Sequence, residues 1–137
     1  MSPGEYAENM RITIQSIDGS ESNWVVGFIC NFGKGRGNWR VKKPFLNQEY
    51  DVEIDLISPL VLGSNCKTTN ENKPQIQSSQ DRTIIVAKIS SNPSDCVAIL
   101  QLEDALILAD YLGEFPPIGN WIQITVPQIN LFDTAIL

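Results

Sequence analysis

A row of four carboxylates is the first part of the chain with the chemistry for a site. Acidic and apolar residues alternate through residues 49–56, which read Glu-Tyr-Asp-Val-Glu-Ile-Asp-Leu. Side chains of a β-strand point alternately to its two faces, so the acidic ones share a face: Glu49, Asp51, Glu53 and Asp55. Such a row could bind Ca²⁺ or Mg²⁺, or supply an acid–base pair. Same-face neighbours lie about 7 Å apart, which is wide for one ion. We therefore expect no metal site, but a solvated face paired with Arg40 and Lys42.

A basic segment lies immediately before this row. Five of the ten Lys and Arg residues fall between residues 34 and 43, interleaved with glycines and a tryptophan. A flexible basic loop with aromatic side chains is typical of proteins that bind single-stranded nucleic acid. The neighbouring acidic row and the net charge of −6 weaken the attraction for a polyanion, so a plain charged hairpin is favoured. Nucleic-acid binding through residues 32–45 stays the alternative. Its candidate residues are Lys34, Arg36, Trp39 and Arg40.

The chain contains no histidine, which excludes Ser-His-Asp and Cys-His catalysis and every His-ligated metal site. Its three cysteines form no Cys-x-x-Cys pair, so zinc and dithiol chemistry have no support. Cys30 and Cys96 lie on apolar strand faces and are predicted to be buried, whereas Cys66 lies in a polar segment and is expected to be exposed. We predict no catalytic residue and no cofactor. An enzyme that uses only carboxylates stays a minor alternative.

The length of 137 residues fits one domain with a core of its own. Residues 1–10 carry no periodicity and are expected to be a flexible arm, which leaves residues 11–137 as a single β-domain. The apolar faces of its predicted strands should meet in one core. The core residues expected from that reading are Trp24, Phe28, Ile54, Ile89, Leu100, Ile122 and Ile124.

Alternating apolar residues predict an all-β domain of six to eight short strands. Residues 105–111 could also be helical, since Ala and Leu favour helix, but the segment is short for a helix and a strand is preferred. Ser16 falls on the apolar face of the first strand, which indicates a β-bulge or a strand end. The predicted strands are residues 11–17, 23–32, 38–43, 49–56, 83–90, 96–102, 105–111 and 121–126, with the alternation resuming at 129–132.

Two segments between these strands are predicted to be loops. Residues 33–37 alternate glycine with Lys and Arg, which indicates a flexible loop. The strand that follows it, at 39–43, is expected to pair antiparallel with 49–56 through a short turn that contains proline. Residues 63–82 are rich in polar residues around the isolated Ile76 and predict a long, mobile excursion.

Several of these features resemble an OB-type small barrel over residues 11–132. They are a long bent early strand with a glycine in its middle (Gly27), a variable middle excursion, and a Pro-Gly loop that leads into the final strands. The resemblance implies a small β-barrel. The helix usual in the middle of an OB-fold has no counterpart in this sequence, so a sandwich of short strands stays open.

The sequence favours a non-catalytic binding module whose partner is another protein, of the adaptor or immunity-protein type. Aromatic side chains often anchor protein interfaces, and the candidates are Trp39, Trp121 and Phe115, which could equally be core or rim residues of a barrel.

The compartment follows from three negative features of the sequence. The start of the chain lacks the basic and apolar regions of a secretory signal. No apolar run approaches the roughly 18 residues of a membrane-spanning helix. Three widely spaced cysteines argue against a disulfide framework, and we expect a cytoplasmic protein with no membrane partner. The oligomeric state is left open by these patterns.

Overall fold

A computed structural model describes residues 10–134 except 41, 80 and 104. Within those residues the protein is all-β with no helix, as predicted. Twelve strands are assigned in the described ranges, more than the six to eight expected. The additional strands are short, and two of them, β6 and β7, lie in the segment predicted to be a polar excursion.

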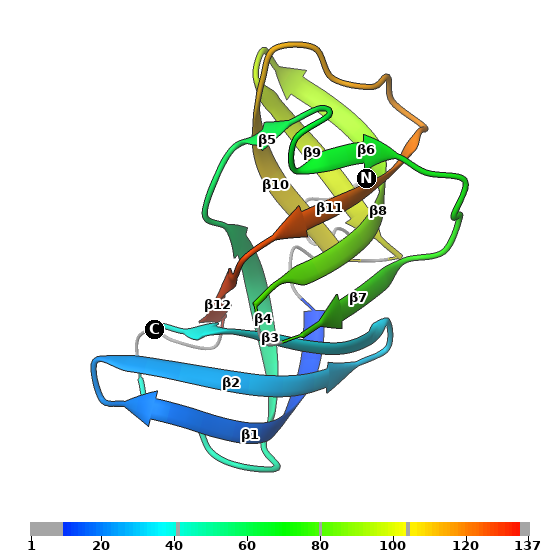
Figure 1. The fold of residues 1–137 in the computed structure, drawn as a ribbon. Helices are drawn as coiled ribbons and strands as arrows, with labels where there is room; N and C mark the ends of the chain where they lie inside the picture. Colours follow the sequence, from blue (N-terminus) through cyan, green and yellow to red (C-terminus); the bar gives the residue numbers. More distant parts are fainter. Residues whose placement is uncertain (1–9, 41, 80, 104, 135–137) are drawn as a thin grey trace.

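Five of the strands close into a small barrel, which lies in the lower part of Figure 1. They follow the order β1–β2–β3–β12–β4 and back to β1. Neighbours are antiparallel except β3 and β12, which run parallel where Asn38 meets Asn130 and Trp39 meets Leu131. The barrel strands are β1 (Met10–Ser20), β2 (Asn23–Cys30), β3 (Gly33–Trp39), β4 (Glu49–Leu56) and β12 (Ile129–Asp133).

The strands between β4 and β12 in the sequence form a second lobe, in the upper part of Figure 1. Its sheet follows the order β5–β10–β9–β8–β11–β6. A bridge between Leu62 and Cys66 brings the two ends of this sheet together. The strands are β5 (Leu60–Val61), β6 (Cys66–Thr68), β7 (Gln75–Ser78), β8 (Thr83–Ser94), β9 (Val97–Leu102), β10 (Ala105–Leu112) and β11 (Trp121–Val126).

One strand ties the two lobes together. β7 pairs parallel with β3 at Gly33 and Lys34, and antiparallel with the first half of β8. Buried side chains from both lobes form one hydrophobic cluster. All seven predicted core residues belong to it, six of them buried and Trp24 half-buried against it. The core prediction is therefore confirmed.

The alternation in the first strand has the irregularity that the sequence predicts. Ile12 and Ile14 are buried, and the register of β1 against β2 shifts between Ile14 and Ser16. The shift is a β-bulge, which increases the local twist and lets a short sheet close into a barrel. The preference for a strand over a helix at 105–111 is also confirmed, since these residues lie in β10.

The predicted loop at 33–37 is wrong, because these residues form most of β3. Alternating glycines predict flexibility, but Gly35 is buried, and a methyl group there would overlap the ring of Phe28. The glycines therefore make room for a core side chain, while Lys34 and Arg36 point to the other face. The predicted pairing of 39–43 with 49–56 is wrong too, since β4 pairs with β1 and β12.

The boundaries of three further segments differ from expectation. β1 begins at Met10, which is buried, so the expected arm loses its last residue; residues 1–9 lie outside the described residues. Residues 63–82 contain β6 and β7, and Ile76 is fully buried. β8 extends to Ser94, beyond the end of the strand predicted at 83–90. In the described part of the chain no helix has the length and apolar character to cross a membrane.

Candidate functional site

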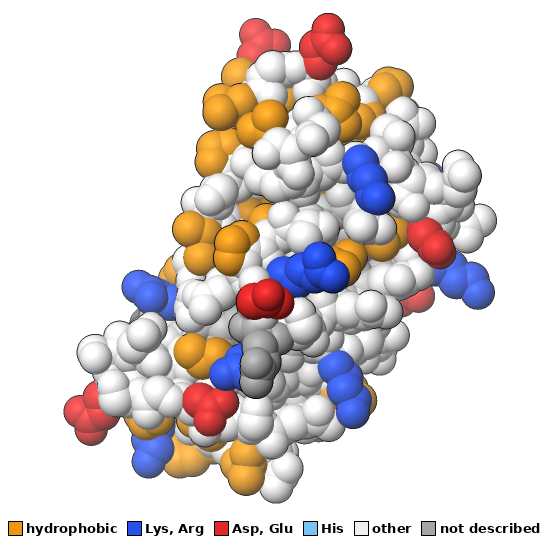
Figure 2. All heavy atoms as spheres, in the orientation of Figure 1, with side chains coloured by type: hydrophobic (Ala, Val, Ile, Leu, Met, Phe, Trp, Pro, Cys, Tyr) orange, Lys and Arg blue, Asp and Glu red, His pale blue; other side chains and the backbone are white. Residues whose placement is uncertain are grey.

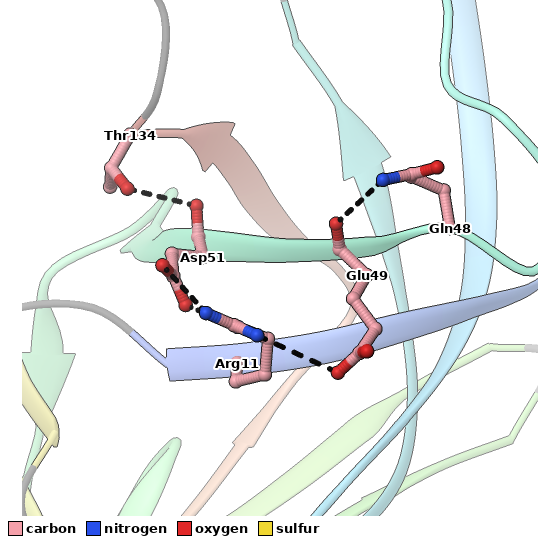
Figure 3. A network of polar contacts seen from close by, with 5 residues as sticks. All are labelled: Arg11, Gln48, Glu49, Asp51 and Thr134. Atoms are coloured by element: carbon pink, nitrogen blue, oxygen red, sulfur yellow. Dashed lines mark hydrogen bonds and ion pairs between the residues drawn. The ribbon is translucent and has the colours of Figure 1, made fainter.

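The carboxylate row of β4 is paired over half of its length, by a cation that the sequence did not indicate. Arg11 of β1 lies opposite Asp51 in the antiparallel register. Its Nε donates to Asp51 Oδ1 at 2.6 Å and its Nη2 to Asp51 Oδ2 at 3.2 Å, while Nη1 lies 3.6 Å from Glu49 Oε2 (Figure 3). The hydrogen bond from Arg11 lowers the pKa of Asp51. The expected partners, Arg40 and Lys42, do not reach these two carboxylates.

Lys42 instead forms an ion pair with the last residue of β12. Its Nζ lies 3.2 Å from Asp133 Oδ2, and the Asp133 side chain is only 1% exposed. The backbone of Arg40 continues the barrel by donating to Leu131 O at 3.1 Å, and its side chain is exposed. Both basic residues follow β3 in the chain, and both of these contacts are made to β12.

The other half of the row borders a groove between the two lobes. Glu53 and Asp55 are exposed on β4, and Asn130 Nδ2 donates to Asp55 Oδ2 at 3.2 Å. Among the residues that the structure describes, Glu53 has no ion-pair partner. The groove has a volume of about 340 Å³. It is lined by Glu53, Ile54, Asp55, Leu106, Leu108 and Phe132.

The groove continues onto an apolar surface on the outside of β10, which we call the leucine face: Leu106, Leu108 and Leu112 of β10, Ile99 of β9 and Val61 of β5. Leu108 lies opposite Ile99, and Leu112 opposite Val61, so these side chains share one face of the sheet. Leu108 and Leu112 are 56% and 57% exposed, respectively. Hydrophobic side chains gather over β5 and β10 in the upper left of Figure 2.

Charged residues surround the leucine face unevenly. Asp110 lies on it, exposed, between Leu108 and Leu112. Glu53 and Asp55 lie at the end that opens into the groove. Lys88 of β8 lies at the far side, in the cross-strand row Lys88–Gln101–Leu106. The groove end is therefore acidic, and the opposite border carries a lysine.

Two of the predicted basic residues lie together on the outer surface of the barrel, in a hollow lined by residues of β1, β2, β3 and β7. Lys34 and Arg36 point outward from β3 into a shallow hollow of about 320 Å³. Arg36 already forms an ion pair, with its Nη2 3.2 Å from Asp18 Oδ2, and its backbone N–H donates to Ser78 Oγ at 2.9 Å. Lys34 takes part in no ion pair of the described residues. With these two cations and the hydroxyl groups of Ser16 and Ser79 in its lining, the hollow can bind an anion weakly.

The three aromatic candidates do not form a common surface. Trp39 is only 3% exposed and packs on Tyr50 with ring centroids 4.7 Å apart, so it is a core residue. Phe115 is half-buried and stacks on Tyr111 with centroids 4.4 Å apart. Trp121 is half-buried at the start of β11. Of the two readings left open for Trp39, the core position is the one observed, because its inward position in β3 alternates with the outward Arg36 and Asn38.

The cysteine predictions are reversed at two positions. Cys66 is buried and Cys96 is exposed, while Cys30 is half-buried. Cys66 pairs with Ile124 in the β6–β11 register, which places it against the core despite its polar neighbours. Cys96 lies in the β8–β9 turn at a φ of 70°, outside the alternation of either strand. Burial raises the pKa of the Cys30 and Cys66 thiols.

The leucine face was missed by sequence reasoning, although a signal for it exists. Residues 105–112 read Ala-Leu-Ile-Leu-Ala-Asp-Tyr-Leu, so both faces of the strand are mostly apolar. Small Ala105 and Ala109 alternate with Ile107 and Tyr111 on the buried face, which leaves the leucines outside. Over the described residues, no cluster of three His, Cys, Asp or Glu side chains is placed to hold a metal ion. No family model, curated protein or solved structure matches this chain.

Proposed function

We propose that this protein is a non-catalytic binding module that docks another protein on its leucine face. The observation that carries the proposal is the pair of leucines, Leu108 and Leu112, left more than half exposed on a regular strand. Sheet faces of monomeric proteins normally carry polar residues where they meet water. A contiguous apolar surface rimmed by charged residues is typical of a protein interface.

The chemistry of the chain supports binding more than catalysis. It contains no histidine. Two carboxylates of the acidic row, Glu49 and Asp51, both form ion pairs with Arg11. A carboxylate fixed in this way is a weak general base, because the guanidinium stabilises its charged form. An adaptor or immunity-type role in the cytoplasm is part of the proposal, and the three free thiols fit a reducing compartment.

The proposal is tested by photo-crosslinking in the native cells. A photoreactive phenylalanine analogue replaces Leu108 in one variant and Glu21, an exposed residue of the β1–β2 turn, in a control variant. A discrete crosslinked protein from position 108, absent from position 21, is the expected result. Crosslinking from position 108 that is no stronger or more selective than from position 21 would contradict docking on this face.

A second candidate function is supported by the barrel itself. The strand order β1–β2–β3–β12–β4 with β3 and β12 parallel supports an OB-like reading of the barrel, and OB-folds bind oligonucleotides on the face of their second and third strands. In this chain that face carries Lys34 and Arg36. Against it stand the net charge of −6 and the ion pair of Arg36 with Asp18.

Titration with mixed single-stranded oligonucleotides at low salt separates the two functions. If protein docking is the function, we expect no binding at micromolar concentrations. Micromolar or tighter binding that is lost when Lys34, Arg36 and Arg40 are changed to Ala would place nucleic-acid recognition ahead of protein docking.

A further inference from the structure

We infer that the segment bound in the groove between β4 and β10 carries an apolar side chain next to a lysine or arginine. This inference rests on the proposed function and names the chemistry of the partner. The groove has two kinds of wall. Leu106 and Leu108 of β10 and Phe132 of β12 provide apolar surface, and Glu53 and Asp55 of β4 provide carboxylates. A purely apolar ligand would leave the carboxylates without a partner, and a purely basic ligand would leave the apolar side chains without an apolar contact.

The volume of the groove sets the size of the inserted group. About 340 Å³ is at the lower end of the volumes of small-ligand pockets, and it accommodates a few side chains rather than a folded domain. Burial of an exposed leucine such as Leu108 is favourable by about 25 cal/mol per Å² of apolar area. The apolar wall therefore supplies affinity for an apolar side chain of the partner.

The carboxylates of Glu53 and Asp55 determine which residues must accompany the apolar side chain of the bound segment. Glu53 has no ion-pair partner in the described part of the chain, and Asp55 accepts one hydrogen bond, from Asn130. Covering Glu53 with a neutral segment would desolvate its charge without compensation. A lysine or arginine at the rim of the groove compensates that charge, and a whole-molecule charge of −6 accelerates the approach of a basic partner.

A second copy of the chain is a poorer occupant by the same reasoning. A symmetric contact through the leucine face would place Asp110 and the groove carboxylates of one copy near the same patch of the other. Like charges in an interface oppose association. Within strands β8, β9 and β10, only Lys88, at the far border, could offset them. Charge complementarity therefore favours a basic segment of a different protein.

The test uses random peptides displayed on phage, selected on the whole protein. Selected sequences are synthesised with each Lys or Arg kept or replaced by Gln, and their dissociation constants are measured by fluorescence anisotropy at low and high salt. Three variants are compared: Leu108→Ser, the double variant Glu53→Gln/Asp55→Asn, and the control Glu21→Gln, which removes an exposed carboxylate on a turn. Near-UV circular dichroism checks that each variant is folded.

The expected result is enrichment of Lys or Arg beside Leu, Ile or Phe. The double variant should bind about 2- to 10-fold more weakly, as expected for one or two exposed ion pairs, and the control should bind normally.

Other outcomes would contradict the inference. Peptides that require Leu108 but bind the double variant as tightly as the parent would overturn the inference of a basic segment, while the proposal of docking on the leucine face would still hold. Peptides indifferent to Leu108→Ser, or no selected peptides at all, would overturn both. Self-association abolished by Leu108→Ser in analytical ultracentrifugation would show that a second copy occupies the face, which also overturns the basic segment.

Discussion

Cys96 presents the most accessible thiol of the chain, in the turn between β8 and β9. Burial raises the pKa of Cys30 and Cys66, which lowers the fraction of reactive thiolate at each. We expect iodoacetamide at pH 8 to alkylate Cys96 first, as followed by peptide mass mapping. The Cys96→Ser variant should lose the fast phase and keep the slow ones. Equal alkylation rates at Cys66 and Cys96 would contradict this prediction, because they would show that β6 opens often enough to make the Cys66 thiol as accessible as that of Cys96.

The ion pair of Arg11 with Asp51 gives a second prediction at the residue scale, on pH dependence. The hydrogen bond from Arg11 holds the pKa of Asp51 below its ordinary value, so unfolding requires proton uptake at acid pH. The stabilisation is complete above about pH 5, where an unfolded Asp is almost fully ionised, and is lost as pH falls through the folded pKa.

The measurement for this pair compares Asp51→Asn with the parent in urea unfolding between pH 3 and 7. The parent should be the more stable at neutral pH, and the difference should shrink toward acid pH. Asp51 is 41% exposed, so salt should reduce the difference as well. Asp55→Asn, whose carboxylate has no cation nearby among the ion pairs of the described residues, is the matched control. An equal pH trend in both variants would argue against the role of Arg11.

Individual residues were harder to place from the sequence than strands. The reversal of Cys66 and Cys96 shows why. Cys66 is surrounded by polar residues, and only the pairing of β6 with β11, more than 50 residues away, buries it. The same holds for Arg11, because its partner on β4 is fixed by the barrel and not by a neighbouring strand in the sequence. Long-range pairing is not visible in local periodicity.

At the scale of elements, β3 depends on glycine for a packing reason. A methyl group at Gly35 would overlap the ring of Phe28, which is 1% exposed. We expect Gly35→Ala to destabilise the fold by about 1–3 kcal/mol, the usual cost of overpacking a core. Denaturant unfolding measures this. Gly27→Ala is the matched control on β2, where the obstructing atom is the end of the Ser16 side chain, which can rotate.

A double variant separates overpacking from the general cost of changing a glycine. In a Phe28→Leu background the smaller side chain leaves room for the methyl group, so Gly35→Ala should cost less than in the parent. A cost of Gly35→Ala that is unchanged in that background would mean that strand geometry, and not the ring of Phe28, requires glycine at this position.

The elements that could be predicted are those with one buried and one exposed face. The strand at 49–56 is such a case, because its alternation is uninterrupted and its apolar side chains do enter the core. β3 could not be predicted, because its inward positions hold glycines that carry no apolar signal. The leucine face was missed for the opposite reason: β10 is apolar on both sides, and periodicity alone does not say which side is left exposed.

At the scale of the whole molecule, the all-β class and the barrel followed from the strand pattern, whereas the pairing order did not. The segment expected to pair with β4, residues 39–43, is not its neighbour in the structure, and β12, from the end of the chain, takes that place. The insertion of β5 to β11 between two adjacent barrel strands also has no local signature. Both features depend on which distant apolar faces fit together.

The shared core gives a prediction on cooperativity of the two lobes. Phe28 in the barrel and Ile124 in the second lobe belong to one hydrophobic cluster, and β7 pairs with a strand of each lobe. We therefore expect the lobes to unfold together. Ile124→Ala should lower the free energy of unfolding by about 2–5 kcal/mol without changing the denaturant dependence. Amide hydrogen exchange should then become faster by a similar factor in β2 and in β11.

Phe28→Ala provides the reciprocal measurement from the barrel side. It should accelerate exchange in β11 as well as in β2, because loss of the barrel removes β3 as a partner of β7 and exposes the side of the second lobe that packs on it. Independent lobes would respond differently: each substitution would accelerate exchange only in its own lobe, and the unfolding curve would separate into two transitions. Cooperative unfolding also bears on function, since the groove between β4 and β10 keeps its shape only while both lobes stay folded against each other.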